Sequence, residues 1–382
     1  MKNNKFFPEI HGNFGFGCMR LPMNGDDVDH EEFCRMADAF ISSGLNYLDT
    51  AHGYINGKSE TAIRECVSKR YKRSDFLLTD KLSSSFFKTN EEIRPFFESQ
   101  LQACGVEYFD FYLMHAQDRD DYPKYKKCRA YETAQELKRE GLVKHVGISF
   151  HDTAEVLDLI LTEQPEIEIV QIQLNYADYD DLSIQSKKVY EVCEKHGKPV
   201  IVMEPVKGGK LVNLPADADA ILKDLNGGSN ASYALRFAAG FKNIAMVLSG
   251  MSNMEQMTDN LSTLDGDGKI VPLNDREMSA IDKVKEIFKK QNIIPCTACR
   301  YCVEENKCPK GIRIPDIFEL LNSYETFRSW SAPYFYGTEL TSNGHGKASD
   351  CIKCGKCEKV CPQHLKIREL LEKVANTFEK KD

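Results

Sequence analysis

Short apolar runs alternate with amphipathic stretches over residues 1 to about 265. Seven runs read as strands ending in NYLDT, DFLLTDK, FDFYLMH, LVKHVGIS, IVQIQLN, PVIVME and IAMVLSG, and the early GFGCMRLP supplies an eighth. Helix-like segments such as EEFCRMADAFISSG and EEIRPFFESQLQACG separate them. Eight β–α units in a stretch of this length predict an α/β fold, a (β/α)8 TIM barrel.

Glycines mark the ends of several predicted helices. Gly44, Gly105 and Gly197 each follow an amphipathic segment, where a helix commonly ends. A doubly wound parallel sheet is the alternative fold, since it also alternates strands with helices. No G-x-G-x-x-G turn follows the first strand, which disfavours a dinucleotide-type Rossmann unit.

A second domain is expected after the barrel. The polar segment NDREMSAIDKVKEIFKKQN begins at residue 274 and predicts a bridging helix. Beyond it, IPDIFELLNSYETF and LKIRELLEKVANTF predict two more helices, with FRSWSAPYFYG as an aromatic loop between them. We therefore expect a barrel over 1–265, a bridging helix over 266–291 and a small, mainly helical domain over 292–382.

Composition and charge exclude several classes of partner. The 382 residues are 42% hydrophobic and 28% charged, with a net charge of −8 and no dense stripe of Lys and Arg, so no nucleic-acid partner is expected. No apolar run reaches the roughly 18 residues of a membrane-spanning helix. The first residues lack the apolar core of a secretory signal, so we expect no membrane partner and a cytoplasmic location.

The 14 cysteines fall into two groups. Six have no ligand spacing and are interpreted as small buried hydrophobic residues: Cys18, Cys34, Cys66, Cys104, Cys128 and Cys193. The other eight lie close together near the end of the chain: Cys296, Cys299, Cys302, Cys308, Cys351, Cys354, Cys357 and Cys361. A secreted disulfide scaffold would not confine its cysteines in this way.

The two cysteine runs have the spacing of a ferredoxin-like module. C-x2-C-x2-C-x3-C-P is the bacterial ferredoxin pattern; CIKCGKCEKVCP matches it, whereas CTACRYCVEENKCP has five residues before its fourth cysteine. Three closely spaced thiolates wrap one cubane and the fourth reaches its neighbour. Two 4Fe–4S clusters are therefore predicted, one held by Cys296, Cys299, Cys302 and Cys361, the other by Cys308, Cys351, Cys354 and Cys357. Structural zinc is the alternative, but it usually takes cysteines in pairs.

The barrel region resembles the aldo/keto reductases over about residues 14–262. LDTAHGYINGKSE, LLTDK and FYLMH follow the order of that family's motifs and bring Asp49, Tyr54, Lys81 and His115 to strand ends or the loops after them. The resemblance implies reduction of a small-molecule carbonyl substrate. Tyr54 would be the acid, Lys81 would lower the pKa of its phenol, Asp49 would orient Lys81, and His115 would bind the substrate oxygen.

The same resemblance implies a nicotinamide site that this chain matches less closely. The expected contacts are Ser149, Gln171, Met203, Ser249, Gln256 and Asn260. Gly250 and Gln256 stand where many members carry Lys and Arg for the 2′-phosphate. A phosphate without a cationic partner binds poorly, so NAD is favoured over NADP. Lys207 and Lys210 are the other cations that could bind the phosphate.

The two predicted modules differ in their electron chemistry. A hydride carries two electrons, whereas a 4Fe–4S cluster transfers one. One hypothesis is an iron–sulfur oxidoreductase whose clusters exchange electrons through a flavin or a redox partner protein. The second is an electron-transfer or redox-sensing protein that uses the barrel as a scaffold. The third is a reductase with structural clusters.

An arrangement of the two modules is also expected from the order of the chain. In the aldo/keto reductases the chain after the last barrel helix commonly runs back over the strand ends, which predicts that the cysteine module packs against the catalytic mouth. The aromatic residues Trp330, Tyr334, Phe335 and Tyr336 are the candidate contact. The alternative is that they fill the core of the module.

Overall fold

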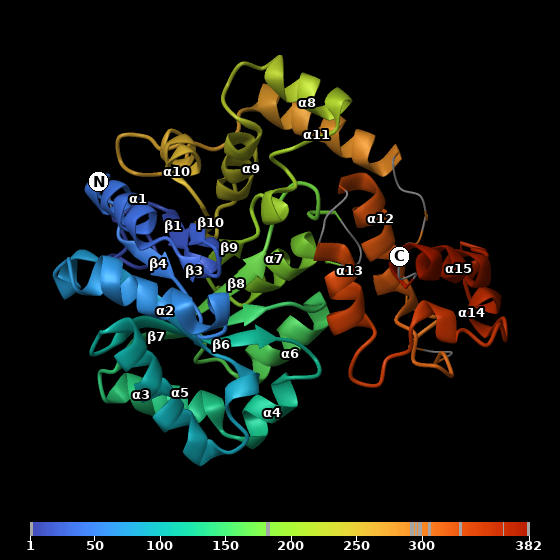
Figure 1. Cartoon of the computed structure of the whole chain (residues 1–382), viewed down its shortest axis with the longest axis horizontal. Coiled ribbons are helices and arrows are strands. Elements are labelled where there is room, and N and C mark those ends of the chain that lie inside the picture. Colours follow the sequence, from blue (N-terminus) through green and yellow to red (C-terminus); the bar gives the residue numbers. More distant parts are fainter. Residues whose placement is uncertain are drawn as a thin grey trace. The chain divides into compact units, whose positions relative to one another are not determined.

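The computed structural model describes residues 3–180, 184–290, 294, 296, 300–304, 307–327, 331–361 and 363–379. Its internal contacts divide the chain into two compact units (Figure 1). The first comprises 3–180, 184–213 and 222–279, and the second comprises 214–221 and the described residues from 280 onward. The domain limits drawn from the sequence stay a prediction.

Eight parallel strands close into a barrel in the first unit (Figure 1). They are β1 (Phe14–Gly17), β4 (Tyr47–Asp49), β5 (Leu77–Leu82), β6 (Phe109–Gln117), β7 (Val143–Phe150), β8 (Ile169–Gln173), β9 (Val200–Met203) and β10 (Ile244–Gly250). Closure is complete because β1 pairs with both β4 and β10. The predicted (β/α)8 fold is confirmed. A short hairpin of β2 (Met23–Asn24) and β3 (Asp27–Val28) was not predicted.

Helices follow the strands around the barrel. They are α1 (His30–Ser42), α2 (Lys58–Ile63), α3 (Ile93–Cys104), α4 (Tyr122–Lys127), α5 (Ala130–Arg139), α6 (Ala154–Glu163), α7 (Ser186–Lys195), α9 (Asn230–Ala239) and α10 (Met254–Leu261). Gly44, Gly105 and Gly197, expected at helix ends, have φ of 88°, 67° and 65°. Only glycine takes this left-handed conformation without a steric penalty, which explains why these helices end there.

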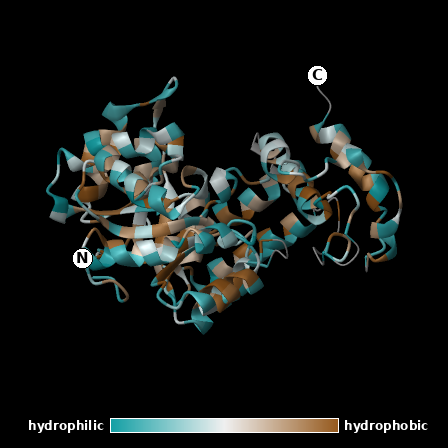
Figure 2. Cartoon of the chain, turned by 90° about the horizontal axis from the view of Figure 1, so that it is seen from below, coloured by the Kyte–Doolittle hydropathy of each residue, from teal (hydrophilic) through white to brown (hydrophobic). Residues whose placement is uncertain are grey.

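The barrel interior is packed at the end where the strands begin. Phe7 and Ile10, from the segment before β1, join a buried cluster with residues such as Tyr47, Phe111 and Ile201. The rings of Phe7 and Phe111 lie 5.2 Å apart edge to face. In Figure 2 the strands are largely brown, whereas the helices alternate between brown and teal, as expected for strands covered on both faces. The opposite ends of the strands carry the polar side chains.

The second unit is mainly helical. It contains most of α8 (Ala216–Lys223) and of α11 (Asp275–Lys290), together with α12 (Ile314–Phe327), α13 (Ser331–Phe335), α14 (Lys356–Lys359) and α15 (Ile367–Phe378). Buried residues of α12 and α15, among them Ile317, Phe318 and Leu371, pack with the cysteines in one core. No helix in the described parts of the chain is long and apolar enough to cross a membrane.

The stretch expected to be an aromatic loop is helical. It forms α13 and a π-helical turn, Tyr336–Leu340. Tyr336 is buried in the core of the module, where its hydroxyl accepts a hydrogen bond from the Ala348 amide at 2.8 Å and donates one to Glu379. Tyr334 and Phe335 are exposed, and Trp330 lies outside the described residues. Tyr336 therefore fills the core of the module, as the alternative interpretation of the aromatic residues expected.

Candidate functional site

Lys81 lies at the centre of a polar cluster at the carboxyl ends of β4 and β5. Its ammonium donates to Asp49 Oδ1 at 2.6 Å, to the Thr50 carbonyl at 2.7 Å and to the Tyr54 hydroxyl at 3.3 Å. An ammonium has three protons, so this set uses all of them. The Lys81 side chain is fully buried. Burial alone would lower the pKa of Lys81, but Asp49 and Tyr54 outweigh it and raise that pKa.

Tyr54 begins the 3-10 turn Tyr54–Gly57, in the loop that follows β4. The next two residues, Ile55 and Asn56, have φ of 51° and 53°, a left-handed conformation that is costly for a β-branched residue. Burial raises the pKa of the Tyr54 phenol, and the opposing effect of Lys81 does not cancel this rise. The expectation of a lowered phenol pKa is therefore wrong, because desolvation is the larger effect.

His115 faces Tyr54 from β6. The two rings lie 6.0 Å apart edge to face, and His115 Nδ1 is 2.6 Å from the Ser83 hydroxyl. Burial, followed by the charges of Lys81 and His151, holds the pKa of His115 well below its usual range. The ring is therefore neutral near pH 7. Ser83, which sets the orientation of this ring, was not predicted from the sequence.

Two of the residues expected to bind the nicotinamide lie beside this cluster. Ser149 and Gln171 are partners in the β7–β8 register, and both are buried. Gln171 Nε2 donates to Asp49 Oδ2 at 3.1 Å, and the Ser149 hydroxyl accepts from the Ala116 amide at 2.8 Å. The structure thus brings Gln171 to the carboxylate that binds Lys81. No local pattern in the sequence indicates this contact, because 122 residues separate the two.

The other expected contacts lie at the ends of β9 and β10 and in α10. Asn260 Nδ2 donates to the Ser249 hydroxyl at 2.9 Å, and both residues are buried. Gln256 accepts from the Ser252 amide at 2.7 Å, in the first turn of α10. Met203 is half-buried at the end of β9, where its register partner is Gln173 on β8. These residues all belong to the edge of the barrel that carries Lys81.

Arg20 lies beside the β10–α10 loop and was not predicted from the sequence. Its carbonyl accepts from the Ser252 hydroxyl at 2.9 Å, and its guanidinium lies 3.2 Å from Glu204 Oε1. Lys207, which the sequence offered as a phosphate ligand, is instead paired with the buried carboxylate of Asp178. Arg20 is therefore a cation close to the loop where the sequence predicted none.

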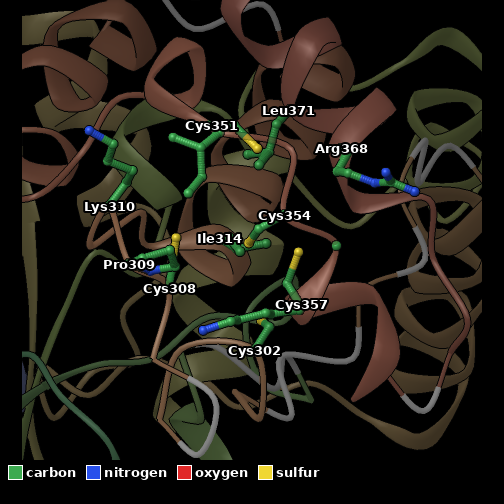
Figure 3. Close-up of a pocket in the computed structure, with 13 residues that line it drawn as sticks. Cys302, Cys308, Pro309, Lys310, Ile314, Cys351, Cys354, Cys357, Arg368 and Leu371 are labelled. Carbon is green, nitrogen blue, oxygen red and sulfur yellow. The ribbon is translucent and has the colours of Figure 1, made fainter.

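Five cysteines from both runs line one hollow in the second unit, which we call the first site, and four of them form one predicted ligand set (Figure 3). These four are Cys308, Cys351, Cys354 and Cys357, the set that the spacing assigned to one cluster. Cys302, the fifth, lines the hollow together with Ile314, Lys310, Lys356 and Arg368. Figure 3 shows the sulfur atoms of Cys308, Cys351 and Cys357 turned toward the space that the cysteines surround. The hollow has a volume of about 370 Å³, including space open to solvent.

A second hollow, the second site, is lined by Cys296, Cys302 and Cys361. These are the described members of the other predicted ligand set, since Cys299 lies outside the described residues. Its remaining lining is mostly apolar and includes Phe318, Leu365 and Ile367. Cys302 and Ile314 line both sites, so the two sites adjoin each other.

The residues of both sites fit iron–sulfur clusters. The seven described cysteines of the module gather at two places. Cubane clusters are bound through cysteine thiolates, four to each cluster. The assignment of each cysteine to its cluster stays a prediction.

The cysteines of the barrel unit are mostly as expected. Cys18, Cys104, Cys128 and Cys193 are buried free thiols. Cys34 on α1 and Cys66, in the turn after α2, instead form a disulfide with Cα atoms 4.7 Å apart. The interpretation of these two as packing residues is therefore wrong. Their separation of 32 residues offered no motif that would have revealed the pair.

Comparison with known families agrees with both units. The family model "Aldo/keto reductase family" matches residues 13–286. The chain belongs to the aldo/keto reductase family. The model "4Fe-4S dicluster domain" matches residues 295–366. The chain is accordingly an oxidoreductase of aldo/keto reductase type with a dicluster domain, and the predicted recognition of both modules is confirmed.

Individual relatives are distant. The chain is 23% identical over 278 residues to "Uncharacterized oxidoreductase YqkF" of Bacillus subtilis, covering 65% of this chain and 85% of that protein. Among solved structures it resembles aldo-keto reductase AKR11C1 of Bacillus halodurans, with a TM-score of 0.58, 24% identity and 71% and 91% of the two chains covered. The Klebsiella pneumoniae aldo-keto reductase in complex with NADPH matches with a TM-score of 0.60, 18% identity and 75% and 95% coverage. These structural matches establish the fold alone.

Proposed function

We propose that the barrel reduces a carbonyl group of a small molecule, with Tyr54 as the proton donor. The contact between Lys81 and the Tyr54 hydroxyl carries this proposal, because a buried ammonium is held at the oxygen that would lose the proton. The raised pKa of Tyr54 keeps the phenol protonated near neutral pH, so the proton is available when substrate arrives. As the proton leaves, Lys81 stabilises the forming phenolate.

Asp49 and His115 position the reacting groups. Asp49 fixes the Lys81 ammonium, and its charge offsets the cost of burying that cation. His115 is neutral, so it offers the carbonyl oxygen a hydrogen bond without competing for the proton of Tyr54. Two donors directed at this oxygen stabilise the negative charge that develops on it, as in an oxyanion hole.

A nicotinamide cofactor is the proposed hydride source. Gln171 and Ser149 would bind its carboxamide, Met203 would pack against its ring, and Ser249, Gln256 and Asn260 would contact the adenosine end. Bound there, the cofactor supplies two electrons as a hydride. We propose NAD rather than NADP, since Gly250 and Gln256 offer no charge to a 2′-phosphate.

The eight cysteines of the module would hold the two 4Fe–4S clusters, which supply one-electron transfer. A flavin is the group that usually converts between a hydride and single electrons. We therefore propose a flavin as the group that would link the nicotinamide to the clusters. Anaerobically purified protein should be examined for a flavin band at about 450 nm after the broad cluster absorption is subtracted. A flavin would connect the two chemistries within one chain, whereas its absence would leave either a separate redox partner protein or clusters with a structural role.

The Tyr54→Phe variant tests the proposed reaction. Carbonyl reduction should fall by about 10²–10⁴-fold, while nicotinamide binding, followed by fluorescence, is retained. Tyr108→Phe is the matched control, because the Tyr108 hydroxyl also contacts a lysine, Lys144, at 3.4 Å but lies outside the cluster around Lys81. Unchanged turnover in Tyr54→Phe would refute the role of Tyr54 and place the acid elsewhere, whereas an unmodified protein that reduces no carbonyl substrate would favour a barrel that serves as a scaffold for electron transfer or redox sensing.

A further inference from the structure

The two cysteine sites differ in exposure. At the first site Cys354 is exposed, and the neighbouring Ile352 has 56% of its surface accessible. At the second site the described cysteines that do not also line the first, Cys296 and Cys361, are half-buried, and the lining residues Phe318 and Ile367 are buried. An electron that enters from a protein in solution would therefore reach the first site before the second.

The exposed edge of the first site is cationic. Lys310, Lys356 and Arg368 line it, and no acidic residue does so among the described residues. Arg368 is paired with Glu358, and the nearby Lys353 with Glu372. The stretch 347–368 holds six Lys and Arg against two Asp and Glu, although the whole chain has a net charge of −8. The positive charge is thus concentrated where the cysteine is exposed.

An exposed apolar residue completes this surface. Ile352 lies between two cysteines of the run and lines the hollow while remaining open to solvent. Protein interfaces commonly combine a small apolar contact with charged residues at the rim, where charge governs the rate of encounter. We call the surface made by Lys310, Ile352, Cys354 and Lys356 the entry face.

We propose that the entry face docks an acidic protein that carries single electrons. The carrier would lose one electron, and the cluster held by Cys308, Cys351, Cys354 and Cys357 would gain it, with no bond formed and no proton moved. The second site, which shares Cys302 and Ile314 with the first, would then receive the electron. This proposal rests on the proposed cluster assignment and deepens it by naming the class of partner.

Neutralisation of the cluster is the competing role for the same lysines. A cubane with four thiolates carries a net charge of about −2 when oxidised, so nearby cations stabilise it. That role would be served by buried or exposed cations alike, and it requires neither Ile352 nor an open cysteine edge. The two roles differ in what charge reversal changes: the potential of the cluster in one case, and the binding of a carrier in the other.

The test uses the anaerobically purified full chain and oxidised plant-type 2Fe–2S ferredoxin, an acidic carrier, as the probe. Binding is measured by calorimetry, and electron transfer from the reduced ferredoxin by stopped-flow absorbance. The double variant Lys310→Glu/Lys356→Glu should bind about tenfold or more weakly at low ionic strength, and the difference should shrink at about 0.5 M salt. Lys373→Glu, an exposed lysine of α15 outside the lining of the first site, is the matched control.

Three further measurements separate the outcomes. Iron content and EPR spectra show whether the variants hold clusters, and a lack of iron in the unmodified protein would refute the proposed clusters rather than the entry face. Reduction by dithionite, a small anion, should be equally fast in the double variant and the control at about 0.5 M salt, where its charge is screened. Unchanged ferredoxin binding in the double variant, with or without a shifted cluster potential, would overturn the docking proposal.

Discussion

Gln171 donates a hydrogen bond to the Asp49 carboxylate across the interior of the barrel, at 3.1 Å. Lys81 occupies the other oxygen of the same carboxylate at 2.6 Å. A residue expected to contact the cofactor is therefore also part of the network that holds the ammonium of Lys81. Changes at Gln171 should consequently affect both the stability of the barrel and the binding of a nicotinamide.

Gln171→Met retains the approximate volume of the side chain but removes its donor. The buried Asp49 Oδ2 would lose a partner, and loss of a hydrogen bond to a buried charged group costs about 1–3 kcal/mol. Urea unfolding followed by circular dichroism should show this loss in the free energy of unfolding. Gln102→Met, at an exposed position on α3, should change that free energy by less than about 0.5 kcal/mol. Equal stability of the two variants would mean that the Gln171 contact contributes nothing.

The two cysteine sites predict cluster-selective losses. The unmodified protein should contain about eight iron and eight sulfide per chain. Cys354→Ala should remove the EPR signal of one cluster and Cys361→Ala that of the other, because each of these cysteines lines a single hollow. Cys193→Ala, a buried cysteine of α7, should leave both signals. Zinc without sulfide in the unmodified protein would contradict the iron–sulfur assignment.

The strand ends could be located from the sequence, but the contacts between them could not. Asp49 and Lys81 lie at or next to the end of an apolar run. Because parallel strands end at the same edge of a barrel, the pattern predicted that Asp49 and Lys81 lie close together. The contact of Ser83 with His115 depends on rotamers, and the pair of Arg20 with Glu204 spans 184 residues. No local pattern records either contact.

The sequence also did not indicate which of two opposing effects on the pKa of Tyr54 is the larger. The presence of Lys81 near Tyr54 correctly predicts a contribution that lowers the phenol pKa, but the larger effect is burial, which depends on the whole fold. The stretch expected to be an aromatic loop is helical although it contains Pro333. Proline is tolerated in the first turn of a helix, where the amide has no partner within the helix, and Pro333 lies in the first turn of α13.

We expect the preference between NAD and NADP to depend on Arg20. Its guanidinium is paired with Glu204, so binding a 2′-phosphate would require breaking that pair. We expect NADH to bind at least as tightly as NADPH, as measured by titration of nicotinamide fluorescence. Glu204→Gln should free Arg20 and shift the preference toward NADPH, whereas Glu204→Gln combined with Arg20→Gln should not. A clear NADPH preference in the unmodified protein would show that another cation binds the phosphate.

A buried acid pair on the outer side of β5 predicts a pH-dependent stability. The carboxylates of Glu60 and Asp80 and the thiol of Cys104 lie within 4.8 Å of one another, and all three residues are buried. Burial raises the pKa of Glu60 to about 7. Burial and the charge of Glu60 raise that of Asp80 well above its usual range. The pair therefore holds at least one proton through the neutral range, and the two groups titrate together.

The sign of the effect follows from the raised pKa. An unfolded glutamate loses its proton at about pH 4.3, whereas folded Glu60 keeps it until about pH 7. The folded state therefore binds more protons between these values, so the contribution of Glu60 is fully present at low pH and is lost as the pH rises through 7. The full loss is on the order of 3–4 kcal/mol. Glu60→Gln cannot ionise and lacks this dependence.

Urea unfolding of the unmodified protein and of Glu60→Gln at several values between pH 5 and pH 8 measures this contribution. The free energy of unfolding of the unmodified protein should fall relative to that of the variant as the pH rises. Glu98→Gln, an exposed position on α3, controls for the general loss of a carboxyl group and should follow the unmodified protein. Parallel curves for Glu60→Gln and the unmodified protein would show that Glu60 is ionised in the folded barrel at pH 5, with His52, 2.9 Å from its Oε2, as the partner that stabilises its charge.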